Sequence, residues 1–225
     1  MSLEAASALI AYPARAAFGR TLPKNKIYEH AGANAKLKNL FIAQVEQIVW
    51  QYKLAPETIN LTAQAGVPEI QVFSIQLKTP KLNLDVLRCI DSAVQYPILF
   101  ELSFDGRTQV IAAYKRPSGL EANPWLLSQY FATAWFSNDT ERAVMPLALD
   151  LAGLYEQLLR RLVPTAARAG ESLAECIARA KQATLMQRKV DQTASKLAKE
   201  KQFNRKVEIN AQLRKLMNEL QELLK

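Results

Sequence analysis

The dipeptide Asp105-Gly106 constrains the fold more than any other feature of this sequence. It separates two apolar runs in the segment PILFELSFDGRTQVIAAYK, residues 97–115. A two-residue Asp-Gly loop accepts positive φ angles and matches the twist of paired strands, so the segment predicts a β-hairpin. Both faces are apolar at its base, which indicates central strands covered on both sides. The expected register pairs Phe104 with Arg107, Leu102 with Gln109, and Phe100 with Ile111.

Hydrophobic periodicity and turn residues predict the other elements of this region. The expected elements are a helix from Asn34 to a stop before Pro56, a strand over 68–78, a helix over 82–94, a loop over 116–124, a strand over 129–137, and a helix capped by Asn138-Asp139-Thr140 that ends before Pro164. The resulting order of helices and strands predicts an α+β fold with a mainly antiparallel sheet. Trp50, Trp135 and Cys89 are expected in the core, whereas Trp125 is expected to be exposed.

Charge divides the chain into an α+β globular domain, residues 1–165, and a basic helical or coiled-coil extension, residues 166–225. The extension holds 13 Lys and Arg against 7 Asp and Glu, a net charge of +6. The domain holds 16 against 14, a net charge of +2, so the formal charge of +8 belongs mostly to the extension. A basic excess of this kind favours an anionic partner.

The leucines of the extension indicate that its helix pairs with another. Apolar residues recur at intervals of 4, 3, 4 and 3, which is a heptad seam. They are Ile209, Leu213, Leu216, Leu220 and Leu223. An upstream series at Met186, Val190 and Leu197 does not join this register, so the seam must slip or bend near Phe203. We expect the seam to pack against a helix from a second copy of the chain or from a partner subunit.

Lysines and arginines dominate the polar positions of the upstream half of the extension. We expect them to face an anionic surface such as nucleic-acid phosphates. They are Arg188, Lys189, Lys196, Lys199, Lys201, Arg205 and Lys206. The alternative interpretation is a solvated basic face on a helix that does no more than pack.

Residue types argue against several chemistries. A single histidine, His30, cannot form a multi-histidine metal site, and Cys89 and Cys176 lack the paired spacing of a zinc cluster. The sequence has no glycine-rich phosphate loop and no nucleophile elbow. We therefore expect no cofactor and no metal. His30 is expected at a helix end or turn, although it could pair with Glu29 as an acid/base couple.

A nuclease-like arrangement is the one catalytic candidate. Metal-dependent nucleases often place an acid on one strand of a hairpin and a Glu-x-Lys motif on the next. Glu101 and Lys115 occupy comparable positions, but Ala113 stands where the second carboxylate is needed. Glu29 or Asp105 would have to supply that carboxylate. A Glu101 that faces apolar neighbours is more typical of a buried structural acid paired with an arginine.

The sequence also bears on location. No apolar run approaches the ~18 residues needed to cross a bilayer, and the first 20 residues lack the pattern of a secretion signal. We therefore expect a cytoplasmic protein with reduced thiols and no membrane contact.

Several stretches resemble a known prokaryotic family. They are IYEHAGANAKLKNLFIAQVEQIVWQYKLAPETINL, VPEIQVFSIQLK, PILFEL and AAYKRPS. Together they resemble domain-of-unknown-function family 4391 over most of the chain. The resemblance assigns no catalytic residue; it implies an accessory protein encoded beside DNA methyltransferases and helicases of restriction or defence systems.

We therefore expect a non-enzymatic accessory or interaction subunit of a DNA-modification, restriction or defence-type complex. Its C-terminal helix would contact a protein partner or a second copy, and its basic tail would contact nucleic acid. The alternatives are a degenerate or unusual metal-dependent nuclease and a homo-oligomeric scaffold unrelated to DNA.

Overall fold

A computed structural model describes residues 8–118 and 125–225. Most of the predicted 116–124 loop therefore lies outside the described residues. The chain divides into two compact units, Met1–Leu162 and Val163–Lys225. None of the described helices is long and apolar enough to cross a membrane.

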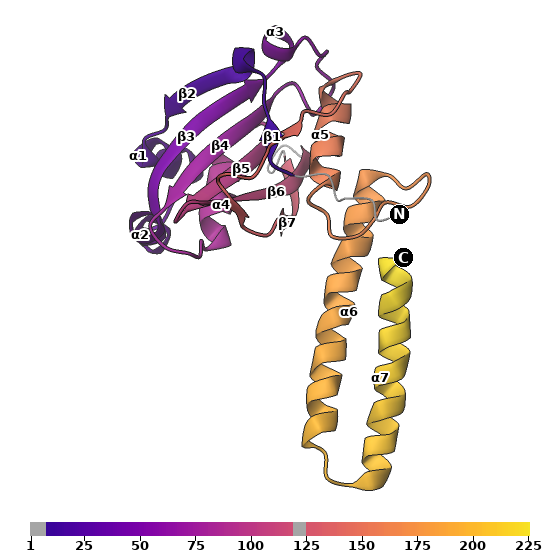
Figure 1. Ribbon diagram of the computed structural model, residues 1–225. Helices are drawn as coiled ribbons and strands as arrows, with labels where there is room; N and C mark the ends of the chain where they lie inside the picture. The colour runs from indigo at the N-terminus through magenta and orange to yellow at the C-terminus, as the bar shows by residue number, and fades with distance from the viewer. Residues whose placement is uncertain (1–7, 119–124) are drawn as a thin grey trace. The chain divides into compact units, whose positions relative to one another are not determined.

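The first unit is built on a mixed, largely antiparallel sheet (Figure 1). Its strands are β2 (Ala17–Thr21), β3 (Val45–Leu54), β4 (Ile70–Leu77), β5 (Ile98–Phe104), β6 (Arg107–Pro117), β7 (Trp125–Ala132) and β8 (Phe136–Ser137). They lie in the order β2-β3-β4-β5-β6-β7, with β8 beside β6, and only the β4–β5 pair of this sheet is parallel in the part of the chain described. The short strands β1 (Ile10–Ala11) and β9 (Ala143–Val144) form a separate parallel pair. The predicted α+β fold is confirmed.

Helices complete the core of this unit. They are the short η1 (Ala14–Ala16) and α3 (Pro56–Ile59), with α1 (Lys24–Ala31), α2 (Ala35–Gln44), α4 (Leu84–Ala93) and α5 (Leu151–Arg160). One core joins Phe41 of α2 and Ile90 of α4 to Phe73 and Phe100 of the sheet. Cys89 belongs to the same core, as its place beside the apolar face of the predicted 82–94 helix indicated.

The central hairpin has the register that the Asp-Gly turn predicts. Phe104 pairs with Arg107, and the pairing continues without a shift to Leu99 and Ala112. Asp105 and Gly106 have φ angles of 47° and 67°, which is the type I′ geometry. The observed register is therefore the one that a two-residue type I′ turn favours.

Substitution of Gly106 by Val should lower the free energy of unfolding of the first unit by about 1–2 kcal/mol. An added Cβ would meet no atom within 4 Å, so the loss would come from the positive φ and not from a clash. Gly106→Asn is the matched control, because Asn tolerates left-handed backbone and should lose less. Urea unfolding followed by tryptophan fluorescence measures both variants. Equal stability of the Val variant and the parent chain would contradict the turn assignment.

The helix predicted from Asn34 to Pro56 is only half correct. Asn34 does cap a helix, since its Oδ1 accepts from the Leu37 amide at 2.9 Å, but α2 ends at Gln44 and the chain continues as β3. Bulges interrupt β3 near Val45 and again near Trp50, and they shift the inward-facing positions. A bulged strand thus produces the three- and four-residue spacing of a helix, while its β-branched and aromatic residues favour the sheet.

The helix predicted to start at Asn138-Asp139-Thr140 begins later than expected. That tripeptide forms a turn, and Asp150 is the actual N-cap, with its Oδ1 accepting from the Gly153 amide at 2.8 Å. Leu147 is 95% exposed, so it does not belong to the helix face. Pro146 offers the physical reason, because a proline disfavours helical backbone at the residue before it.

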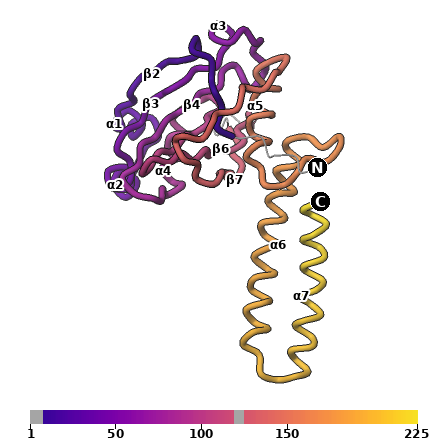
Figure 2. The backbone as a smooth tube through the Cα atoms, in the orientation of Figure 1, coloured from indigo at the N-terminus to yellow at the C-terminus, as the bar shows by residue number. Residues whose placement is uncertain are grey.

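The second unit is a pair of long antiparallel helices, α6 (Leu173–Lys199) and α7 (Phe203–Leu224). Figures 1 and 2 show the chain reversing between them. Ser172 and Glu175 form a capping box at the start of α6. The break falls at residues 200–202, directly before Phe203, where the heptad register slips.

Candidate interaction surface on the C-terminal helical hairpin

The leucine seam of α7 packs against α6 of the same chain. Ala183 and Val190 of α6 and Leu220 of α7 form the buried centre of this contact. Met186, Leu213, Leu216 and Leu223 pack around them, and Leu197 and Ile209 are half-buried nearer the turn. The prediction that this seam faces a second chain is therefore wrong. The short connection at 200–202 folds α7 back onto α6, so the partner helix comes from within the chain.

A buried arginine fixes the open end of the hairpin. Arg179 of α6 donates to both carboxylate oxygens of Glu171 at 2.7 Å, to the Ala166 carbonyl at 2.6 Å and to the Leu223 carbonyl at 2.8 Å. The hydrogen bond from Arg179 is the main reason that the pKa of Glu171 falls to about 2. One side chain thus ties the end of α7 to α6 and to the segment before α6.

The predicted anion-binding residues are all exposed on this hairpin. Two of them, Arg188 and Lys189, lie along α6. The other five form a group that we call the basic tip: Lys196, Lys199, Lys201, Arg205 and Lys206. They occupy the last turn of α6, the connection and the first turn of α7, so the fold concentrates charge that is spread over eleven residues of sequence.

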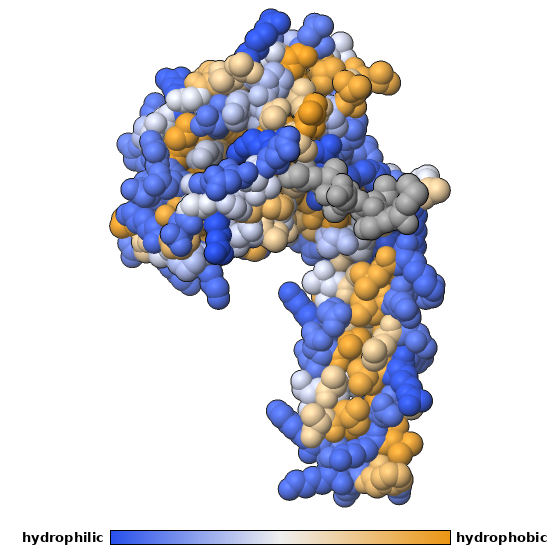
Figure 3. Space-filling view, in the orientation of Figure 1, coloured by the Kyte–Doolittle hydropathy of each residue, from blue (hydrophilic) through white to orange (hydrophobic). Residues whose placement is uncertain are grey.

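The basic tip combines this charge with exposed apolar groups. Phe203 is 78% exposed and Val207 is 54% exposed. Glu200 is the acid within the connection, and its Oε1 accepts from the amides of Lys201 at 2.7 Å and Gln202 at 2.9 Å. Its other oxygen lies 3.8 Å from Nε of Arg205, a loose pair with a largely exposed guanidinium that leaves the excess of positive charge at the basic tip. Figure 3 shows hydrophilic side chains along the flanks of the hairpin and apolar ones between its helices.

The structure places Glu101, the first candidate catalytic residue, in a structural ion pair. Its two carboxylate oxygens each accept from Arg142 at 2.8 Å, and Arg142 also donates to the Ile10 carbonyl at 2.9 Å. Glu101 is buried in the middle of β5. This pairing connects the sheet to the segments that carry β1 and β9, which is the structural role expected of a buried acid.

Lys115, the second candidate, belongs to a different buried cluster. Its Nζ donates to the carbonyls of Asp91 and Val94 at the end of α4 and lies 3.6 Å from the Asp91 carboxylate. It also lies 5.6 Å from the ring centroid of Trp125, which is half-buried and not exposed as predicted. The Tyr130 hydroxyl donates to the other oxygen of Asp91. Burial raises the pKa of Asp91 to about 6 and lowers the pKa of Lys115.

The hydroxyl group of a tyrosine satisfies the backbone hydrogen-bonding groups next to Lys115. β6 has a register shift between Ala113 and Lys115. Tyr155 of α5 accepts from the Lys115 amide at 3.0 Å and donates to the Ala113 carbonyl at 2.9 Å. The bulge turns the Lys115 side chain toward α4, and Tyr155 replaces the ladder hydrogen bonds that the bulge removes.

The two remaining candidate acids, Glu29 and Asp105, do not join these clusters. Asp105 lies in the turn between β5 and β6. Glu29 and His30 lie in the last turn of α1, before the left-handed cap Gly32. Within residues 8–118 and 125–225, no group of three or more His, Cys, Asp and Glu could hold a metal ion. Cys89 and Cys176 are both free and buried. The described residues therefore do not bring the nuclease-like set together.

Sequence reasoning missed the partners of these buried charges. A buried ion pair could have been predicted at Asp91. This residue lies four residues after Leu87 on the apolar side of the predicted helix, where a buried acid needs a partner. The contacts of Arg142 and Tyr130 could not have been predicted, since each meets its partner across about 40 residues of sequence.

Comparisons with known proteins identify one family. The model described as "Domain of unknown function (DUF4391)" matches residues 10–220 of the chain. This match spans both structural units. No curated protein and no solved structure matches the chain.

Proposed function

This chain belongs to the DUF4391 family, and we propose that it acts as a non-enzymatic accessory or interaction subunit of a DNA-modification, restriction or defence-type complex. The observation that carries the proposal is the basic tip, where five exposed cations surround the turn of a self-contained hairpin. Such a surface suits the phosphates of a nucleic acid, because each lysine or arginine that meets a phosphate releases condensed counterions.

The hairpin is also suited to contact a protein. Its seam is satisfied within the chain, yet Leu185, Met217 and Leu224 are each about half exposed beside it. Arg179 and the short connection hold the two helices in register without a partner. A preformed hairpin loses little conformational freedom on docking, which favours a role as an interaction arm.

The buried charges support a non-enzymatic role over the nuclease alternative. Glu101 is neutralised by Arg142, and Lys115 is engaged by Asp91 and by the end of α4. Metal-assisted hydrolysis needs carboxylates that share one open site. The described residues hold these two candidates in separate ion pairs.

Reversal of two charges at the basic tip should weaken DNA binding. For the full chain with Lys199→Glu and Lys201→Glu, we expect affinity for a fluorescent duplex to fall roughly tenfold or more at low salt. The slope of log K against log salt should fall by about 1 for each lost phosphate contact. Fluorescence anisotropy across a salt series measures both quantities.

The matched control changes the same total charge elsewhere on the hairpin. Lys181→Glu with Arg214→Glu alters one exposed residue of each helix outside the basic tip. This control should retain most of the affinity and the parent salt slope. If both double variants weakened DNA binding equally, net charge and not the basic tip would explain the affinity. If the parent chain did not bind DNA, the proposed nucleic-acid contact would be wrong.

A further inference from the structure

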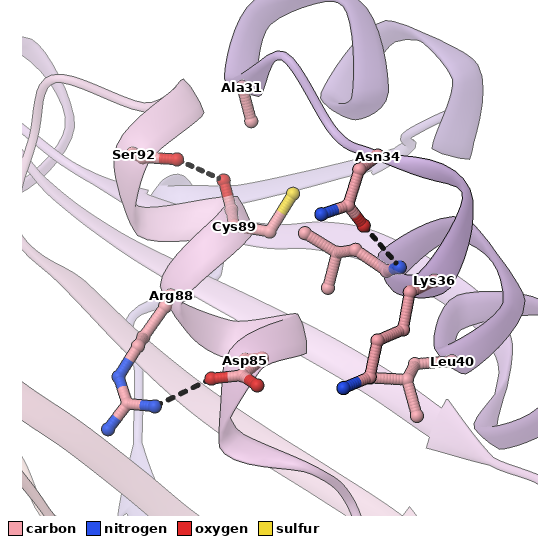
Figure 4. A pocket seen from close by; sticks show the side chains of 9 residues that line it. Ala31, Asn34, Lys36, Leu40, Asp85, Arg88, Cys89 and Ser92 are labelled. Carbon is pink, nitrogen blue, oxygen red and sulfur yellow. Dashed lines mark hydrogen bonds and ion pairs between the residues drawn. The ribbon is translucent and has the colours of Figure 1, made fainter.

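A pocket of about 510 Å³ opens in the first unit between the start of α2 and the outer side of α4 (Figure 4). None of the predicted site residues lines it. Its volume falls in the range of small-molecule sites, about 300–1,000 Å³. Its apolar lining consists of Ala31, Leu37, Leu40 and the buried Cys89.

The polar rim of this pocket is richer in donors than in acceptors. Asn34 uses its Oδ1 to cap α2, so its amide nitrogen is the group that remains to meet a ligand, and Figure 4 shows it beside the pocket. Lys36 contributes an ammonium from the first turn of α2, and Arg88 contributes a guanidinium from α4. Ser92 also lines the rim, but it donates inward to the Cys89 carbonyl at 2.8 Å.

Asp85 is the single acid of the rim. Its Oδ1 accepts from Arg88 at 2.7 Å, and both side chains are more than half exposed. An exposed pair of this kind is weak, about 0–1 kcal/mol, so an incoming anion can compete for the guanidinium. One carboxylate and one buried thiol are too few for a metal site, and two cations with an amide donor favour a negatively charged ligand.

We propose that this pocket binds a small organic anion, whose apolar or aromatic body rests on Leu37, Leu40 and Cys89 while its charged group meets Lys36 and Arg88. The ligand class is a compact acid that carries a carboxylate, sulfonate or phosphate. The site uses no residue of the C-terminal hairpin and thus goes beyond the accessory role proposed above.

Two fluorescent probes of matched shape test this assignment on the full chain. Anilinonaphthalene sulfonate carries the expected negative charge, and N-phenyl-1-naphthylamine is its neutral counterpart. The parent chain should bind the sulfonate, and Lys36→Gln with Arg88→Gln should weaken that binding by about tenfold, roughly threefold for each charge. Binding of the neutral probe should not change. The same loss for both probes, or no loss for either, would overturn the proposal.

Two further variants test the pocket, one expected to raise the affinity for the sulfonate probe and one expected to leave it unchanged. Asp85→Asn should strengthen sulfonate binding by roughly twofold or more, because it frees Arg88 and removes a repelling charge. Lys26→Gln with Lys38→Gln removes two nearby charges that do not line the pocket and should leave binding unchanged. A response of this control equal to that of the pocket variant would refute a defined site.

Competition experiments show whether the pocket prefers a phosphate or a carboxylate as the charged group of its ligand. 1-Naphthyl phosphate and 1-naphthoate share one ring system, and the one that displaces the sulfonate probe at lower concentration identifies a phosphate or a carboxylate ligand. Either result supports an organic-anion pocket. Failure of both to displace the probe would contradict it.

Discussion

Replacement of Lys115 by Met should lower the free energy of unfolding of the first unit by about 3–5 kcal/mol, because it leaves a charge partner buried without its counter-ion. Lys115 is 1% exposed and is the cation that meets Asp91 and the two carbonyls at the end of α4. Urea unfolding followed by tryptophan fluorescence reports this unit, since Trp50, Trp125 and Trp135 all belong to it.

The pH dependence of this loss of stability shows whether the unpaired Asp91 carboxylate causes it. Without Lys115, the raised pKa of Asp91 should rise further above 6, because the cation that lowers it is gone. A carboxyl whose folded pKa exceeds its unfolded value costs stability above that folded pKa, and the cost fades as pH falls through it. The loss should therefore be larger at pH 8 than at pH 5.

A second substitution serves as the control for Lys115→Met. Lys115→Met with Asp91→Asn removes both charges and should recover part of the lost stability, as expected when an unpaired buried charge is the cause. Additive losses in the double variant, or a loss independent of pH, would contradict this account of the cluster.

The second large effect concerns the seam of the hairpin. Leu216→Asp with Leu220→Asp should separate α7 from α6 and unfold much of α7, because it places two carboxylates in the contact with Ala183 and Val190. Loss of a buried leucine such as Leu220 costs about 2–5 kcal/mol, and the partly buried Leu216 packs against the same small cluster. Circular dichroism should show the lost helix, and hydrogen exchange should locate it in α7.

The matched control for the seam uses the outer side of the same helix. Ala211→Asp with Asn218→Asp changes exposed residues opposite the seam and should leave the helix signal largely unchanged. Light scattering of the parent chain adds an independent check. Full helicity in the seam variant would contradict the packing of α7 on α6 within one chain. A parent chain that scatters as a dimer, with a seam variant that scatters as a monomer of unchanged helicity, would show that the seam pairs two chains.

Local signals explain the parts of the fold that could be predicted. The Asp105-Gly106 turn set the pairing of β5 and β6, and the helical spacing over 82–94 located α4. Each of these features depends on residues close together in sequence, and there the local preference and the final structure agree.

The errors arose where long-range packing determined the structure. Residues 45–54 have helical spacing, but pairing with β4 makes them a strand whose bulges imitate that spacing. The seam leucines were recognised as a helix contact, yet nothing in their spacing states whether the partner helix belongs to another chain or lies upstream in the same one. The turn at residues 200–202 contains no glycine or proline, the residues that usually indicate a turn in a sequence.

The candidate site was predictable to a similar degree. The basic residues of the extension and their exposure followed from composition and periodicity. Their concentration at one turn did not, because it depends on the break between α6 and α7. The ion pairs of Glu101 and Lys115 likewise required the tertiary structure to identify Arg142 and Asp91 as their partners.

The most direct test of the accessory-subunit role is purification of the tagged full chain from its native host, followed by mass spectrometry of the chains that remain bound. We expect a DNA methyltransferase or helicase subunit in constant ratio to this chain, retained after nuclease treatment. Recovery of the chain alone, or only with copies of itself, would contradict the proposed role and favour the scaffold alternative.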